Sequence, residues 1–140
     1  MRRQPMSPRK FKRVQNASQL DWQKGAEALG KELERHAFMA LVEAKNGGAA
    51  IQTVRLTEPF SNDDMRGWDI VITDMKGVSH PLQVKSSKFA AQKFLQREQN
   101  AREQTPVIVP QLRDNYQQVL DKIGEVMPFL RGFKFEEGET

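Results

Sequence analysis

Apolar residues recur at helical spacing through the first third of the chain. Between Ser18 and about Lys45 the repeating apolar positions are Leu29, Leu33, Ala37, Ala40, Leu41 and Ala44. A period of three to four residues predicts a long amphipathic helix with one buried face. Gly47 and Gly48 come next and supply a stop signal, since glycine is the residue most often found just beyond a helix.

Three short apolar segments of strand type follow this helix. Residues 50–56, 68–73 and 81–85 are rich in residues that favour strands and are bounded by turn or polar residues. The turn residues 74–77 separate the second segment from the third and predict an antiparallel hairpin. The polar stretch 57–66 is predicted to be a loop.

The remaining pattern predicts a helix, a strand and a last helix. Ser86 or Ser87 is a suitable N-cap. The helix that follows reaches about residue 104, and one face of it carries Phe89, Ala90, Phe94 and Ala101. Residues 105–110 are apolar with two prolines, as in a short strand. The last helix carries Val119, Leu120, Ile123, Val126, Met127 and Leu130. The order α-β-β-β-α-β-α predicts an α/β fold.

The composition fits one domain that needs no disulfide or structural metal. A chain of 140 residues can bury a core of its own, and this chain has no cysteine. The absence of cysteine excludes a disulfide framework and cysteine-ligated metal sites, and it agrees with a reducing cytoplasm. No apolar run approaches the roughly 20 residues that span a bilayer. We therefore expect a cytoplasmic protein with no membrane partner.

Positive charge is concentrated near the N-terminus. The net charge is +4, and six basic residues precede the first acidic residue, Asp21. These six are Arg2, Arg3, Arg9, Lys10, Lys12 and Arg13, and without them 16 of the 22 basic residues remain against 18 acidic ones. We predict a flexible basic arm over residues 1–16, a single domain over 17–135 and an acidic tail over 136–140. The arm either lies along a phosphate backbone or only aids solubility.

Three polar residues interrupt the apolar hairpin. Asp69 stands at the start of segment 68–73, and Gln83 and Lys85 share one face of segment 81–85 because side chains alternate along a strand. A polar residue at the start of a buried strand needs a partner. The hairpin therefore predicts that an aspartate, a glutamine and a lysine lie close together.

Oxygen atoms from this part of the hairpin suit a hard divalent cation. Mg²⁺ and Mn²⁺ prefer oxygen ligands, and Asp69 can supply a carboxylate, Gln83 an amide oxygen and Val84 its main-chain carbonyl. Lys85 can hold or deprotonate an attacking water, or neutralise charge on a phosphate. The residue types thus predict a metal site that acts on a phosphodiester.

Residues 29–109 resemble the PD-(D/E)XK nuclease superfamily. Gly67-Trp68-Asp69 and Gln83-Val84-Lys85 stand where that superfamily has an aspartate on one strand and a Glu/Gln-x-Lys triplet on the next. The resemblance is nearest to the Holliday-junction resolvases and the Mrr-like domains. It implies a restriction-endonuclease-like mixed β-sheet flanked by helices, with the site at one edge. It also implies catalytic roles for Asp69, Gln83 and Lys85.

Two positions differ from the usual motif. Trp68 replaces a proline that only shapes the start of the strand. Gln83 replaces a carboxylate and removes one negative charge, although Mrr-like members carry glutamine here. The resembled families contribute a glutamate from the first helix, and the candidates in this chain are Glu27, Glu32 and Glu34. Glu34 is favoured because it lies one helical step from Ala37 and two from Leu41, beside the buried face.

Further basic residues follow the hairpin. Lys88 and Lys93, with Ser86 and Ser87 at the start of the same helix, are candidate contacts to a DNA backbone. The candidate contacts of the arm are Arg9, Lys10, Lys12 and Arg13. A charged helix face is also typical of an ordinary solvated surface.

Together these features lead us to expect a metal-dependent DNA endonuclease directed by DNA structure or by a partner rather than by base sequence. We expect a homodimer or a protein partner that supplies specificity. Two rival interpretations stay open. One is a catalytically inactive nuclease-fold module for DNA binding or assembly. The other is a general interaction domain whose basic arm binds acidic surfaces.

Overall fold

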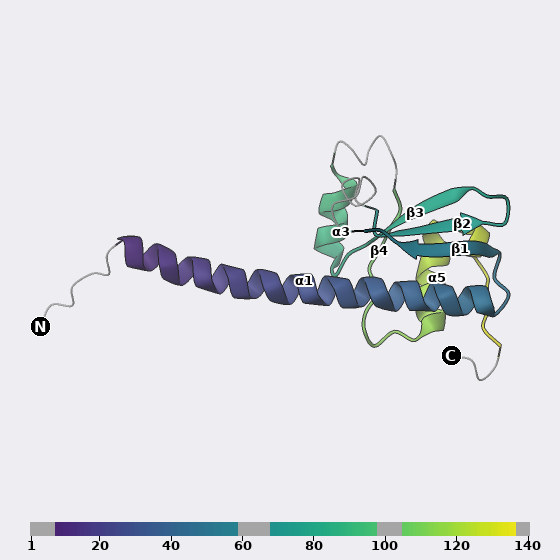
Figure 1. Cartoon of the computed structure of the whole chain (residues 1–140), viewed down its shortest axis with the longest axis horizontal. Coiled ribbons are helices and arrows are strands. Elements are labelled where there is room, and N and C mark those ends of the chain that lie inside the picture. Colours follow the sequence, from purple (N-terminus) through teal and green to yellow (C-terminus); the bar gives the residue numbers. More distant parts are fainter. Residues whose placement is uncertain (1–7, 59–67, 98–104, 137–140) are drawn as a thin grey trace, which may run out of the picture.

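The helices and strands follow the order predicted from the sequence. The computed structural model describes residues 8–58, 68–97 and 105–136, with side chains described from residue 24 onward. The elements are α1 (Pro8–Asn46), β1 (Ile51–Leu56), β2 (Ile70–Asp74), β3 (Ser79–Val84), α3 (Lys88–Leu95), β4 (Val107–Ile108), α5 (Tyr116–Val126) and the 3₁₀ helix η1 (Pro128–Leu130). The predicted α/β class is confirmed (Figure 1).

The four strands form one mixed sheet in the order β1-β2-β3-β4. The pairs β1–β2 and β2–β3 are antiparallel, whereas β3–β4 is parallel. Asp74 closes the predicted hairpin turn, because its carboxylate accepts hydrogen bonds from the main-chain N–H groups of Lys76 and Val78 at 2.9 and 3.0 Å. The sheet is therefore antiparallel except where β4 joins the end of β3.

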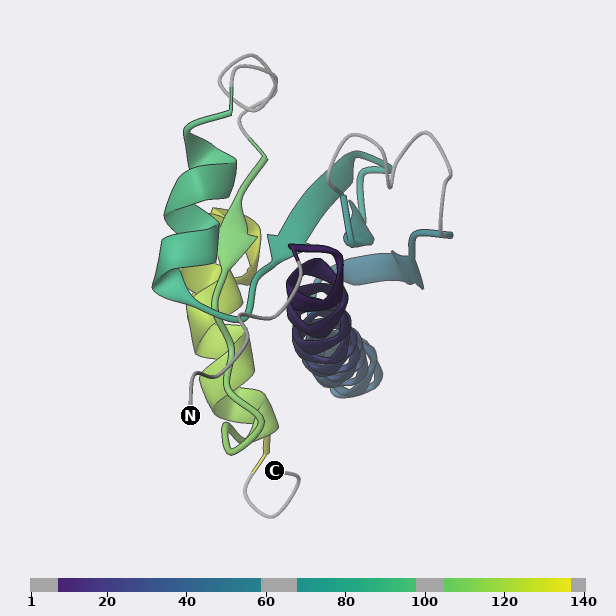
Figure 2. The same cartoon turned by 90° about the vertical axis from the view of Figure 1, so that its left-hand side faces the viewer.

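The main core lies between one face of the sheet and two helices. Its buried side chains from α1 and α5 include Leu33, Ala37, Leu41, Val119, Leu120 and Ile123, and those from the sheet include Ile70, Ile72, Leu82 and Val84. Helix α3 lies on the other face of β3, because Phe94 of α3 contacts Lys85, which follows Val84 and so points to the opposite face. Strand β4 contacts both α3 and α5 (Figure 2).

Helix α1 begins ten residues earlier than predicted. Residues 8–16, which we expected to be a flexible arm, are helical in the structure. This stretch has no apolar period, but it is rich in Lys, Arg and Gln, which form helices readily, and Pro8 is tolerated at a first helical position. The N-terminal part of α1 projects beyond the rest of the domain (Figure 1). None of the described helices is apolar enough over a sufficient length to cross a membrane.

Two other boundaries differ from the prediction. Helix α3 ends at Leu95 rather than near residue 104, and the main-chain N–H of Arg97 closes its last turn by bonding the Phe94 carbonyl at 3.1 Å. Strand β4 has two residues rather than six, because Pro106 and Pro110 have no N–H to donate to a neighbouring strand. Most of the predicted loop 57–66 and of the acidic tail lies outside the described residues.

Candidate active site

Asp69 lies at an irregularity where β2 begins. Its main-chain N–H donates to the carbonyl of Leu82 at 2.9 Å, and the next residue, Ile70, is paired with the same Leu82. Two residues of one strand therefore face one residue of the other, as in a β-bulge, which redirects the side chain. The Asp69 carboxylate points along the sheet, and its Oδ2 accepts a hydrogen bond from the Val84 N–H at 2.8 Å.

The main chain of Val84 faces this carboxylate. The N–H groups of Gln83 and Lys85 donate to the carbonyls of Pro106 and Ile108 at 2.9 and 3.0 Å, so the polar main-chain groups of Val84 point the other way. The Asp69 carboxylate thus accepts the hydrogen bond from Val84 that a neighbouring strand would otherwise accept. The carbonyl of Val84 lies on the same side of the strand as its N–H, which is the side that its predicted role as a metal ligand requires.

Two threonines hold Trp68, the residue before Asp69. The hydroxyl of Thr57 donates to the Trp68 carbonyl at 2.6 Å, and the Trp68 indole N–H donates to the hydroxyl of buried Thr105 at 3.1 Å. Through these contacts the residue before Asp69 is held on one side by Thr57, which follows β1, and on the other by Thr105, which precedes β4. The sequence carried no signal for them, because the threonines are 11 and 37 positions away from Trp68.

Glu34 is the first-helix glutamate that the structure brings to Asp69. Its carboxyl group lies in hydrogen-bonding contact with the carboxyl of Asp69, and both carboxyl groups lie close enough to Lys85 to affect the pKa of Lys85. Glu27 and Glu32 are exposed elsewhere on α1. The helical spacing that favoured Glu34 therefore selected the residue that meets the hairpin.

Burial and mutual proximity perturb the ionisation of these groups. The pKa of Asp69 is raised from 3.8 to about 7, mainly by burial and also by Glu34, while the Val84 N–H and the Lys85 ammonium act in the opposite direction. Burial also lowers the pKa of Lys85, with a contribution from Arg97, against the attraction of Asp69 and Glu34. A proton or a cation between the two carboxyl groups relieves their repulsion.

Gln83 carries a buried oxygen atom that lacks a partner. Only 5% of this residue is exposed, and within the part of the chain that the structure describes its Oε1 makes no hydrogen bond. Burying a polar atom without a partner costs about 1–3 kcal/mol. The Gln83 Oε1 is therefore suited to act as a ligand to a cation.

The donor atoms of the cluster suit a hard divalent cation. The carboxylates of Asp69 and Glu34, the amide oxygen of Gln83 and the carbonyl of Val84 are all oxygen donors of the kind that Mg²⁺ and Mn²⁺ bind. The cluster has two acidic residues, and the described residues contain no group of three or more His, Cys, Asp or Glu placed to hold a metal ion. A cation at this place would therefore need the neutral oxygens as ligands as well.

Lys85 is held against helix α3. Its Nζ lies 5.2 Å from the ring centroid of Phe94, and the guanidinium carbon of Arg97 lies 5.7 Å from the same centroid. Cations are attracted to the face of an aromatic ring, so Phe94 limits the positions that the Lys85 ammonium can take. The charge of Arg97 lies close enough to Lys85 to lower the pKa of Lys85.

The residues predicted to contact DNA occupy the surface of α3 or lie outside the described side chains. Ser87 is the N-cap of α3, as predicted, because its hydroxyl accepts a hydrogen bond from the Ala90 N–H at 3.1 Å. Ser86, Lys88 and Lys93 are exposed, and the Nζ of Lys93 lies 4.8 Å from the ring centroid of Phe89. The side chains outside the described set are those of Arg9, Lys10, Lys12 and Arg13.

Comparison with known proteins assigns this chain to no group. No family model, no curated protein and no solved structure matches it. The function of the site is therefore argued from the geometry and chemistry of its own residues.

Proposed function

We propose that this protein is a metal-dependent DNA nuclease that uses Mg²⁺ or Mn²⁺ to hydrolyse phosphodiester bonds. The observation that carries the proposal is the contact between Glu34 and Asp69, which are 35 positions apart in the sequence, beside the half-buried Lys85. The Oε1 of Gln83 supports it, because this oxygen, in the same part of β3, makes no hydrogen bond to any residue that the structure describes and could act as a ligand. This combination is the one expected from the resemblance to the PD-(D/E)XK superfamily.

Each residue has a distinct role in the proposed reaction. Asp69 and Glu34 hold the cation through their carboxylates, with the Gln83 amide and the Val84 carbonyl as neutral ligands. When bound, the cation neutralises phosphate charge and makes water a better nucleophile. Lys85, whose pKa burial lowers, takes a proton from the attacking water or donates hydrogen bonds to the phosphate.

In the proposed function the protein selects its DNA substrate by the structure of the DNA or through a partner protein. The basic residues of α3 and of the N-terminal part of α1 suit phosphate contacts, which position a protein on DNA without reading its sequence. A homodimer or a protein partner would then supply specificity.

One observation favours a second candidate function, a catalytically inactive nuclease-fold module for DNA binding or assembly. Gln83 is neutral, so the cluster has fewer negative charges with which to hold a cation than a site with three carboxylates. Such a module would keep the DNA contacts and lose strong metal binding. Metal affinity therefore separates the two functions.

The experiment that tests the proposal is cleavage of labelled duplex, single-stranded, flapped and four-way-junction DNA in Mg²⁺ or Mn²⁺. We expect cleavage by the wild-type protein and by Lys76→Ala, a control at the exposed hairpin turn, and none by Asp69→Ala or Lys85→Ala. Binding without cleavage on every substrate would support the inactive module. Absence of both binding and cleavage would contradict both functions.

A further inference from the structure

A cleft of about 400 Å³ lies beside Glu34, between α1 and the end of β1. It is lined by Lys31, Glu32, Glu34, Arg35, Leu56 and Thr57. Glu34 belongs both to this cleft and to the carboxyl pair with Asp69. The cleft therefore opens directly next to the candidate active site.

The chemistry of the cleft suits a single nucleotide. Lys31 and Arg35 are exposed and stand four residues apart, so they lie on the same side of α1 and present two positive charges to one anion. Leu56 is 38% exposed and supplies an apolar surface. The volume is near the lower end of the roughly 300–1,000 Å³ typical of small-ligand sites, too small for a duplex.

Cationic residues near the candidate site come from two parts of the fold. Lys85 contacts Phe94 of α3, whereas Lys31 and Arg35 belong to α1 and line the cleft beside Glu34. A polynucleotide that runs from the cleft to Lys85 meets positive charge from both. Glu32 and Glu34 both oppose an anion in the cleft, so Lys31 and Arg35 are both needed to balance them, and the cation of the proposed function would neutralise Glu34.

We infer that this cleft receives the nucleotide next to the scissile phosphodiester, with its phosphate on Lys31 and Arg35 and its sugar against Leu56. The inference rests on the proposed nuclease function. It names two positioning residues that bind the strand to be cut and take no part in the hydrolysis itself.

The test is the salt dependence of DNA binding without cleavage. Full-length Asp69→Asn protein in EDTA would be titrated with a fluorescein-labelled oligonucleotide and with its duplex over a range of NaCl concentrations. It would be compared with the same protein carrying Lys31→Ala and Arg35→Ala. The matched control carries Lys45→Ala and Lys76→Ala, which remove the same charge from exposed sites that do not line the cleft.

We expect the slope of log K against log[salt] to fall in magnitude by about 0.7 for the single strand and about 0.9 for the duplex, since Lys31 and Arg35 together hold one phosphate and the loss of one phosphate contact removes that amount. The control pair should leave the slope of the parent protein unchanged. Equal slopes in all three proteins would overturn the inference and leave the nuclease proposal standing. If the parent protein shows no salt-dependent binding to either DNA, both fail.

Discussion

Asp69 and Asp114 each accept a main-chain hydrogen bond at 2.8 Å, but their ionisation shifts in opposite directions. Burial raises the pKa of Asp69 to about 7. Burial also opposes ionisation of Asp114, but the Lys122 ammonium and the Gln111 N–H outweigh it and hold the pKa of Asp114 below its ordinary value. The difference comes from the partners that surround each carboxylate.

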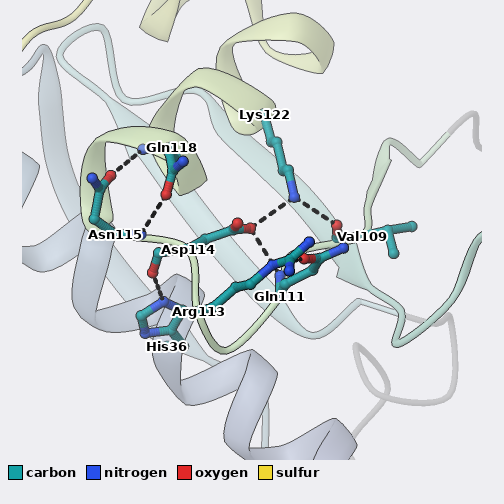
Figure 3. A network of polar contacts seen from close by, with 8 residues as sticks. All are labelled: His36, Val109, Gln111, Arg113, Asp114, Asn115, Gln118 and Lys122. Carbon is teal, nitrogen blue, oxygen red and sulfur yellow. Dashed lines mark hydrogen bonds and ion pairs between the residues drawn. The ribbon is translucent and has the colours of Figure 1, made fainter.

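The surroundings of Asp114 form a closed network (Figure 3). Its Oδ2 accepts hydrogen bonds from Lys122 at 2.7 Å and from the Gln111 N–H at 2.8 Å, and its main-chain carbonyl bonds the His36 ring at 2.7 Å. Lys122 also donates to the Val109 carbonyl at 3.1 Å. These contacts join α1, the segment after β4 and α5, so the network holds elements of the fold together.

The surroundings of Asp69 are not closed in the same way. A second carboxyl group, Glu34, lies against it, and the Oε1 of nearby Gln83 makes no hydrogen bond among the described residues. A polar cluster that satisfies its own members stabilises the fold. A cluster that brings like charges together and leaves an acceptor unpaired is instead suited to bind something else. The predictions below test this contrast.

The largest expected difference is in catalysis. Asp69→Asn keeps the shape of the side chain but removes its charge, so cleavage should fall by about 100-fold or more because the cation is lost. Asp114→Asn should change kcat/KM by less than about threefold, since it lies in the structural network. Single-turnover cleavage by both folded variants measures this. Equal losses in the two would contradict the contrast.

The next largest effect is stabilisation by metal. Mn²⁺ at about 100 times its Kd should raise the free energy of unfolding of the wild-type protein by about 2.7 kcal/mol, because only the folded state has the site. Asp114→Asn should respond in the same way, and Asp69→Asn should not respond. Thermal unfolding with Mn²⁺ and with EDTA measures both. A response that survives in Asp69→Asn would place the metal elsewhere.

The two aspartates should also differ in their contribution to stability. Asp114→Asn should lower the free energy of unfolding by about 1–3 kcal/mol at pH 8, because Lys122 loses a charged partner. Asp69→Asn should raise it in EDTA at the same pH, because a buried charge beside Glu34 is removed. Urea unfolding provides both values. Asp121→Asn, which breaks the exposed pair with Lys134, is the control and should cost at most about 1 kcal/mol.

The stability difference at Asp69 should depend on pH. Its pKa is 3.8 ordinarily and about 7 in the folded protein, so between these values the folded state binds the extra proton. The free energy of unfolding that the Asp69 carboxyl group contributes is therefore fully present below pH about 4. It falls as the pH rises to about 7 and is constant above that pH. The advantage of Asp69→Asn over the wild-type protein in EDTA should therefore grow from pH 5 to pH 8. A constant difference would contradict the raised pKa.

The smallest expected effect concerns Gln83. Gln83→Glu supplies a third carboxylate and should tighten Mn²⁺ binding about tenfold, which corresponds to about 1.4 kcal/mol. Gln83→Met has a similar size but no oxygen, so it should weaken Mn²⁺ binding while leaving the protein folded. Isothermal titration calorimetry measures both affinities. Unchanged affinity in both variants would exclude Gln83 as a ligand.

Much of the architecture was predictable because its signals are local. The spacing of Leu33, Ala37 and Leu41 predicted the buried face of α1, and the turn at Asp74 predicted the hairpin. The same spacing pointed to Glu34. The start of α1 was not predictable in this way, because residues 8–16 have no apolar face and only their helix propensity favours the observed helix.

Contacts between distant segments were not predictable from any local signal. The bonds from Thr57 and Thr105 to Trp68 join three separate segments, and the residues themselves are ordinary. The cleft with Lys31 and Arg35 likewise appears only when α1 packs beside the end of β1.

The sequence by itself determined the order and type of the helices and strands, and which residues carry carboxylate, amide and ammonium groups. Periodicity and turn chemistry act over a few residues, so they are readable along the chain. Only the tertiary structure decided that the Asp69 carboxylate, at a bulge, reaches the Val84 N–H and that Glu34 lies against it. It also decided that the Gln83 Oε1 has no hydrogen bond within the described part of the chain. Those outcomes depend on burial and on distances between segments, and packing alone sets both.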